Sequence, residues 1–230
     1  MNATPHAAQQ WALEAQMRLA ELASPDNAAS MAAYMKHQFA FYGIQTAARR
    51  TCTAPLIAAL GKRPEPEFVL CIAEALWAYP QRECQYLAAD ILRKFALQLP
   101  AEAEPRLANL VISKAWWDTV DTLAAHVYGV LATQHPATLP TLLQHATSPH
   151  LWLRRVAVLY PLMHKHTTDT ARLTQILDLN LSDTDFFIRK AIGWILRQYA
   201  RCQPDWVRGY VDSRGDLLAP LSRREALKHL

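Results

Sequence analysis

Glycine is scarce in this chain, with six among 230 residues. Alternating runs of valine, isoleucine and threonine, which are typical of strands, are almost absent, whereas alanine and leucine are abundant. The apolar residues that remain recur at the spacing of helices rather than of strands. These absences exclude a β-rich fold, and we predict an all-α protein.

The chain also lacks paired cysteines and long apolar runs. Its four cysteines contain no C-x-x-C pair, and three of them fall in predicted helices, where a thiol behaves as a small apolar group. No apolar run approaches about 18 residues, and the first twenty residues carry Glu14 and Arg18 where a signal peptide would be apolar. We therefore expect free thiols and a soluble, cytoplasmic protein that makes no contact with a membrane.

Several motifs of enzyme chemistry are missing as well. No Walker-type loop, G-x-G-x-x-G or H-E-x-x-H motif occurs, which argues against nucleotide-dependent enzymes and the common zinc hydrolases. His164 and His166 lie two residues apart, so on a helix they point in different directions, and no acid or cysteine lies nearby. The sequence predicts neither a metal site nor a cofactor.

The helical segments are separated by prolines and short turns. They are predicted at residues 8–23, 27–39, 45–60, 66–78, 82–98, 102–114, 116–134, 137–147, 149–165, 169–181, 185–201, 204–212 and 222–229. Several neighbours form antiparallel pairs of similar length, as 66–78 and 82–98 do across Pro80. Since the pairs recur about every 35–40 residues, we expect a solenoid of HEAT-like helix pairs in one domain, residues 1–230. A compact irregular bundle is the alternative.

The net charge of +4 is modest, but the basic residues gather late in the chain. They are Arg154, Arg155, Lys165, Arg189, Lys190, Arg197, Arg201, Arg223, Arg224 and Lys228. Most fall in the second helices of predicted pairs, and in an antiparallel stack these helices share one face. A concave groove that holds duplex DNA would use such a face, although an ordinary solvated surface is the alternative.

Residues 116–121 (WWDTVD) are the most distinctive segment. On a helix Trp117 and Asp121 are four residues apart and share a face, whereas Trp116 and Asp118 point elsewhere. Asp118 falls in the first predicted turn, where a carboxylate suits the helix dipole. An indole and a carboxylate on one face can stabilise a developing cation, although a buried core indole is the alternative for Trp117.

Four other segments combine aromatic residues with polar or basic ones. They are 34–36 (YMK), 41–45 (FYGIQ), 151–155 (LWLRR) and 186–197 (FFIRKAIGWILR), and a basic segment, 221–228 (LSRREALK), follows near the end. Together with WWDTVD, and in this order, they resemble the AlkD-like family of DNA alkylation-repair glycosylases over nearly the whole chain.

The resemblance implies hydrolysis of the N-glycosidic bond of purines alkylated at N3 or N7, such as 3-methyladenine and 7-methylguanine, in double-stranded DNA. In that family, contact with the backbone and sugar replaces a base-binding pocket. Its catalytic residues carry over to Trp117 and Trp194, which would flank the deoxyribose, and to Asp121, which would stabilise the oxocarbenium-like sugar and position or deprotonate water. Arg155 would hold a phosphate beside the lesion.

Further DNA contacts are expected from residues at both ends of the chain: Arg154, Arg197, Lys190, Lys165, Tyr34, Lys36, Gln45, Arg50, Arg223 and Arg224. Arg155 and Arg197 could instead be surface arginines in local ion pairs. The chain departs from the family pattern at Gln198, where a glutamate commonly stands, and at Met163, where a basic residue often stands.

Two other functions remain open. One is a non-catalytic HEAT-like protein that binds damaged or branched DNA by shape, and the other is a protein-interaction scaffold, the commonest use of α-solenoids. The presence of Trp117, Asp121 and Trp194 favours the enzyme, and the late cluster of arginines argues against the scaffold. We expect the protein to act as a monomer.

Overall fold

The computed structural model describes residues 3–230, and over that range the chain consists of helices joined by short turns. The one β feature there is an isolated parallel bridge between Ala40 and Gln81. The all-α prediction is confirmed.

None of the helices in the described range combines the length and the apolar character that a membrane span requires. The helices group into two compact units that divide between Arg106 and Leu107.

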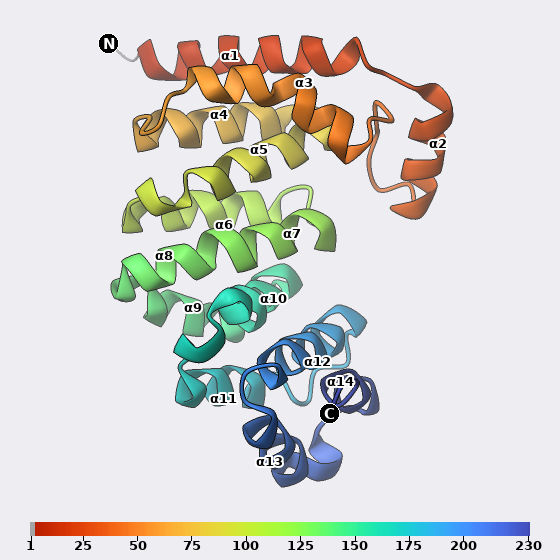
Figure 1. The fold of residues 1–230 in the computed structure, drawn as a ribbon, viewed down its shortest axis with the longest axis vertical. Helices are drawn as coiled ribbons and strands as arrows, with labels where there is room; N and C mark the ends of the chain where they lie inside the picture. Colours follow the sequence, from red (N-terminus) through yellow and green to blue (C-terminus); the bar gives the residue numbers. More distant parts are fainter. Residues whose placement is uncertain (1–2) are drawn as a thin grey trace. The chain divides into compact units, whose positions relative to one another are not determined.

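The first unit is a stack of paired helices (Figure 1). They are α1 (Ala3–Ala20), α2 (Pro25–Tyr34), α3 (Thr46–Ala59), α4 (Pro66–Ala78) and α5 (Arg82–Lys94), and α6 (Glu104–Ile112) spans the boundary between the units. As predicted, α4 and α5 pack as an antiparallel pair, with α1 against α4 and α3 against α5. Pro25 and Pro66 each begin a helix, where the missing N–H breaks no intrahelical bond.

The segment between α2 and α3 is held by the start of α5. The buried carboxylate of Glu83 accepts hydrogen bonds from the backbone N–H groups of Tyr42 (3.0 Å), Gly43 (2.8 Å) and Ile44 (3.1 Å). Gly43 has φ +89°, and a Cβ there would lie 2.1 Å from the carbonyl oxygen of Ser24. The segment therefore needs both a glycine and a buried anion.

Some predicted helix ends are wrong. The expected helix 27–39 stops at Tyr34, because Lys36 and His37 adopt φ values of +56° and +55°, which a helix does not allow. The expected helix 149–165 stops at Leu159, and short 3-10 turns follow it. Pro161 lies in the first of those turns, where its ring is incompatible with a continuing α-helix.

The second unit is built around α10. Its helices are α7 (Trp117–Leu123), α8 (Gly129–Gln134), α9 (Leu139–Ala146), α10 (Leu151–Leu159), α11 (Thr170–Asp178), α12 (Phe186–Ala200), α13 (Pro204–Arg214) and α14 (Pro220–Ala226). In this unit α9 packs against α10, and α10 also packs against α7 on one side and α12 on the other (Figure 1). Residues from α10 can therefore reach both α7 and α12.

A π-helical turn interrupts the long helix that contains the WWDTVD segment. The predicted helix 116–134 is continuous, but Ala124–Tyr128 forms a π turn between α7 and α8. A π turn closes its hydrogen bonds one residue later than an α turn, and such turns are frequent at functional sites. This one lies directly after the α7 residues of the predicted site.

Gly193 allows α12 and α14 to pack closely. A Cβ at Gly193 would lie 2.5 Å from the Cβ of Glu225 and 2.9 Å from the carbonyl oxygen of Ser222. We expect Gly193→Ala to lower the free energy of unfolding by about 1–3 kcal/mol in urea denaturation. Gly209→Ala is the control, because nothing lies within 4 Å of that helical position, and it should raise stability by about 0.5–1 kcal/mol. Equal effects of the two changes would contradict the packing argument.

Candidate active site

Trp117 and Asp121 lie on α7, four residues apart and on one face, as their spacing predicts. The helix begins at Trp117 because Trp116 is extended, with φ −160° and ψ 158°. Asp118 lies in the first turn, and its Oδ1 accepts the backbone N–H of Thr119 at 2.9 Å. The two carboxylates of the segment therefore occupy different environments.

Asp121 forms a forked ion pair with Arg155 of α10. Its Oδ1 accepts from Nε of Arg155 at 2.6 Å, and its Oδ2 accepts from Nη2 at 2.8 Å. Nη1 of the same guanidinium donates to the carbonyl oxygen of Phe187, in the first turn of α12, at 2.5 Å. The side chains of Arg155 and Asp121 are 4% and 15% exposed. Arg155 thus joins α7 to α12 from the helix that packs between them.

Opposing effects act on the Asp121 carboxyl group. Burial raises its pKa, the hydrogen bonds and charge of Arg155 lower it, and the nearby charge of Asp118 raises it slightly. Burial prevails, so the pKa of Asp121 lies above its ordinary value. Asp121 consequently takes up a proton at a higher pH than a solvated aspartate does.

Three aromatic rings pack together beside this ion pair, and we call them the aromatic cluster: Trp116, Trp152 and Phe187. Ring centroids are 5.8 Å apart for Trp116 and Trp152, 5.2 Å for Trp116 and Phe187, and 5.0 Å for Trp152 and Phe187. Asp185 caps α12 by accepting the N–H of Phe187 at 2.6 Å, which fixes the start of that helix. Through the ring of Phe187, whose centroid lies 5.9 Å from the guanidinium carbon of Arg155, the aromatic cluster places apolar surface next to the ion pair.

Trp194 lies on α12, seven residues beyond Phe187, and is partly buried. Seven residues are close to two helical turns, so both side chains project from one face, about 10 Å apart along the axis. The ring of Phe187 belongs to the aromatic cluster, and its backbone carbonyl oxygen accepts a hydrogen bond from Arg155. The expected sugar contacts Trp117 and Trp194 thus come from the two helices that Arg155 joins.

Three of the other basic residues on α10 and α12, which were predicted to contact DNA, are paired with carboxylates. Arg154 lies 3.0 Å from Asp183, and Lys190 lies 2.6 Å from Glu225, to which Arg197 also donates. Lys190 and then Arg197 hold the pKa of Glu225 below its usual value. The local ion-pair alternative for Arg197 is therefore present in the structure. Its partner, Glu225, lies on α14, whereas the residue that follows Arg197 in the chain is Gln198.

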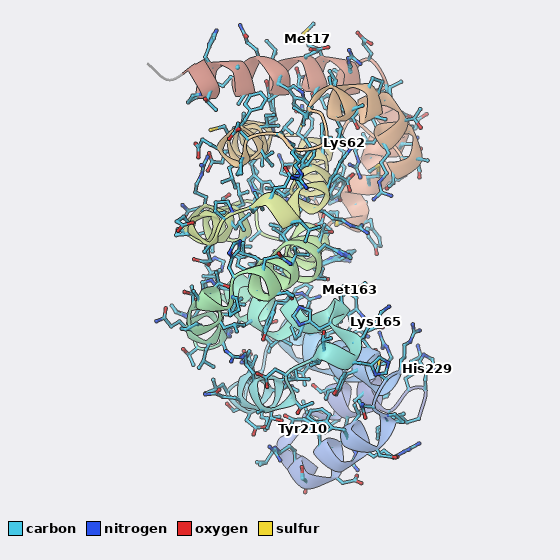
Figure 2. All side chains as sticks on the ribbon, turned by 60° about the vertical axis from the view of Figure 1, so that its left-hand side comes forward. Met17, Lys62, Met163, Lys165, Tyr210 and His229 are labelled. Carbon is cyan, nitrogen blue, oxygen red and sulfur yellow. The ribbon has the colours of Figure 1, made fainter. Side chains whose placement is uncertain are left out.

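Three further predicted contacts lie at the surface of the second unit. Lys165 is exposed on the short turns after α10, near the labelled Met163 in Figure 2, and it has φ +53°. Arg223 and Arg224 are exposed on α14, with Arg223 3.7 Å from Asp212. Their side chains are accessible to a polyanion, and their contact with DNA stays a prediction.

The remaining predicted contacts belong to the first unit. Tyr34 is 70% exposed at the end of α2, Lys36 follows it, and Gln45 precedes α3. Arg50 is exposed on α3 and lies 3.3 Å from Asp90. Their expected place at the other end of a DNA groove stays a prediction.

From the family resemblance we expected Arg155 to hold a phosphate. In the structure its guanidinium binds protein groups instead. Nε, Nη1 and Nη2 of the guanidinium are all engaged, by Asp121 and by the carbonyl of Phe187. The sequence contains no signal for this pair, because 34 positions separate the two residues. Trp152 and Phe187 belong to the segments 151–155 and 186–197 described above, but the sequence did not predict that both rings pack against Trp116.

Potential metal ligands and thiols are dispersed in the described part of the chain. Residues 3–230 contain no group of three or more histidine, cysteine, aspartate or glutamate side chains placed to hold a metal ion. His164 Nε2 lies 2.9 Å from the carbonyl oxygen of Gly129. The four cysteines are free, with Cys84 buried and the others partly exposed.

Comparison with known proteins identifies the family. The family model described as "DNA alkylation repair enzyme" matches residues 15–230. A solved structure, "Predicted DNA alkylation repair enzyme from Enterococcus faecalis", is similar with a TM-score of 0.83 and 34% identity, over 90% of this chain and 96% of that chain. No curated protein matches the chain. The likeness confirms the all-α, solenoid-like fold. The chain belongs to the DNA alkylation repair enzyme family.

Proposed function

We propose that this protein is a monofunctional DNA glycosylase that removes cationic purines alkylated at N3 or N7 from duplex DNA. A purine alkylated at either position already carries a positive charge, so it leaves without a strong general acid. Its departure creates an oxocarbenium-like sugar, and the enzyme has to stabilise that cation. On this proposal the enzyme needs no cofactor and acts as a monomer in the cytoplasm.

The observation that carries the proposal is the orientation of Asp121. A forked hydrogen-bonded pair holds its carboxylate, and Trp117 stands one turn earlier on the same helix face. A fixed carboxylate stabilises a developing cation without reorganising during the reaction. Asp121 also has the chemistry to position or deprotonate the attacking water. Trp117 and Trp194 would offer their π faces to the sugar.

The basic residues would bind the phosphate backbone without reading sequence. In the second unit these are Arg154, Lys165, Lys190, Arg197, Arg223 and Arg224. In the first unit Tyr34, Lys36, Gln45 and Arg50 would supply further DNA contacts, with Tyr34 or Gln45 packing against the opposing strand. Counterion release at such contacts makes DNA affinity fall steeply with salt concentration.

The proposal is tested by the products formed from methylated duplex DNA. We expect free 3-methyladenine and 7-methylguanine, separated by chromatography, and an abasic strand that stays uncut until alkali is added. No lysine nucleophile is assigned to the site, so borohydride should trap no covalent complex with DNA. A trapped complex, or activity on neutral lesions such as uracil alone, would contradict the mechanism. Binding of damaged DNA without base release would favour the non-catalytic alternative.

A further inference from the structure

We infer that residues 35–45, which we call the clasp, form a preshaped contact for DNA phosphates, and that the buried Arg82 and Glu83 are positioning residues that hold its shape. The inference rests on the proposed function and gives a role in DNA binding to two charged groups that the catalytic site leaves unused. The clasp links α2 to α3 and carries Lys36 and Gln45, two of the expected DNA contacts.

The two buried charges are the first reason. Arg82 and Glu83, at the start of α5, are both 0% exposed, and burial of an ionised group is costly unless other groups satisfy it. Glu83 accepts three backbone N–H groups of the clasp, and the guanidinium carbon of Arg82 lies 3.8 Å from the centroid of the Phe39 ring. The backbone N–H of Arg82 also donates to the carbonyl oxygen of Ala40 at 2.8 Å. Both charged residues thus fix the same segment.

The backbone at the start of the clasp is the second reason. Lys36 and His37 have φ values of +56° and +55°, in the left-handed region that residues with a Cβ rarely adopt. Their N–H groups donate to the carbonyl oxygens of Ala33 (3.0 Å) and Ala32 (2.7 Å). This pattern closes the end of α2, and the position of Lys36 in it is usually occupied by glycine. Strain that the surrounding fold maintains is typical of ligand-binding sites.

The side chains that the clasp exposes are the third reason. Met35 and Ile44 are buried near its two ends, whereas Lys36 and Gln45 beside them are exposed. The clasp contains no acidic residue. Within the described part of the chain Lys36 forms no ion pair, in contrast to Arg50 on α3. A cation that is held by fixed backbone and has no carboxylate partner is suited to a phosphate oxygen.

A preshaped contact should act on DNA affinity rather than on the chemical step. Binding to a segment that is already ordered costs less conformational entropy than ordering a loose one. The clasp carries none of the side chains proposed to act on the sugar, which belong to α7 and α12. Loosening the clasp should therefore weaken DNA binding and leave the excision rate of bound DNA unchanged.

Lys36→Gly separates a binding role from a structural one, by urea denaturation and by DNA affinity measured against salt concentration. Glycine adopts a positive φ without strain, so the urea midpoint should rise. DNA binding should nevertheless weaken by about tenfold, and the salt slope should fall by about one unit, because one phosphate contact is lost. A higher midpoint with unchanged affinity and salt slope would overturn the inference.

Lys62→Gly is the matched control. Lys62, labelled in Figure 2, is an exposed lysine on the turn between α3 and α4 of the same unit, and its backbone lies outside the left-handed region. The change removes the same charge without relieving strain, so the urea midpoint should not rise and the affinity should stay within about twofold. An equal loss of affinity in the two glycine variants would overturn the specific role of the clasp.

Arg82→Lys tests the positioning role. Lysine keeps the charge but lacks the planar guanidinium that lies over the Phe39 ring. We expect DNA binding to weaken by about fivefold to tenfold, while single-turnover excision at saturating DNA stays within about twofold. In a Lys36→Gly background the same change should weaken binding much less, because the contact that Arg82 positions is already lost. Equal losses in both backgrounds would contradict the positioning role.

Glu83→Gln keeps the inference testable if Arg82→Lys does not fold. An amide oxygen can still accept the backbone N–H groups of the clasp but carries no charge, so binding should weaken and excision of bound DNA should stay unchanged. Unchanged affinity in a folded Glu83→Gln protein, or slower excision with unchanged affinity, would count against the clasp. Failure of the proposed function looks different, because the unmodified protein would then release no base while the affinities of the variants still followed this order.

Discussion

Asp121→Asn is expected to slow single-turnover excision by on the order of 10²-fold or more and to leave DNA affinity nearly unchanged. The carboxylate would act mainly on the charge of the transition state, so its loss should reduce the chemical step rather than ground-state binding. Free-base release under enzyme excess measures the rate, and fluorescence anisotropy measures the affinity. The variant also removes the counterion of a buried arginine, so both measurements require a temperature at which thermal unfolding shows the variant to be folded.

Asp118→Asn is the matched control for this prediction. Asp118 has the same charge and lies three positions earlier on α7, but its carboxylate accepts the N–H of Thr119 in the first turn, whereas Arg155 forms its fork with Asp121. We expect a much smaller loss of rate there. Equal losses in the two variants would mean that Asp121 is not the catalytic carboxylate.

Glu83→Ala is expected to have the second large effect, a loss of stability. This carboxylate is fully buried and accepts three backbone N–H groups of the segment between α2 and α3. The substitution leaves those donors without their acceptor, so we expect the free energy of unfolding to fall by about 3–5 kcal/mol in urea denaturation.

Glu14→Ala is the comparison for that loss. Glu14 is an exposed partner of Arg18 on α1, and exposed ion pairs contribute at most about 1 kcal/mol. Similar losses for Glu83 and Glu14 would show that the segment does not depend on the buried anion. Glu83→Gln should fall between the two, because an amide oxygen can still accept but carries no charge.

Local sequence signals predicted much of the fold and part of the site. Helical periodicity and proline positions located most helices within a few residues, as with α4 and α12. The shared face of Trp117 and Asp121 also follows from spacing alone, since both lie on one helix. These features depend on residues that are close in the sequence.

Features that depend on distant residues could not be predicted. The partners of Asp121 and of Arg197 lie 34 and 28 positions away, and helical periodicity carries no information about such distances. The end of α2 was missed for a related reason. The backbone leaves the helical region at Lys36, while the contacts that hold the following segment come from Glu83 of α5.

The π turn after α7 has a consequence for comparing relatives of this chain. Because Ala124–Tyr128 holds about one residue more than an α turn, it acts like a single inserted residue between α7 and α8. A relative with a regular helix here would align with a one-residue gap, and one residue corresponds to about 100° of rotation. Sequence identity at Trp117 and Asp121 would then not guarantee an equivalent direction of the two side chains, so family members should be compared by the hydrogen-bond pattern of this helix as well as by its residues.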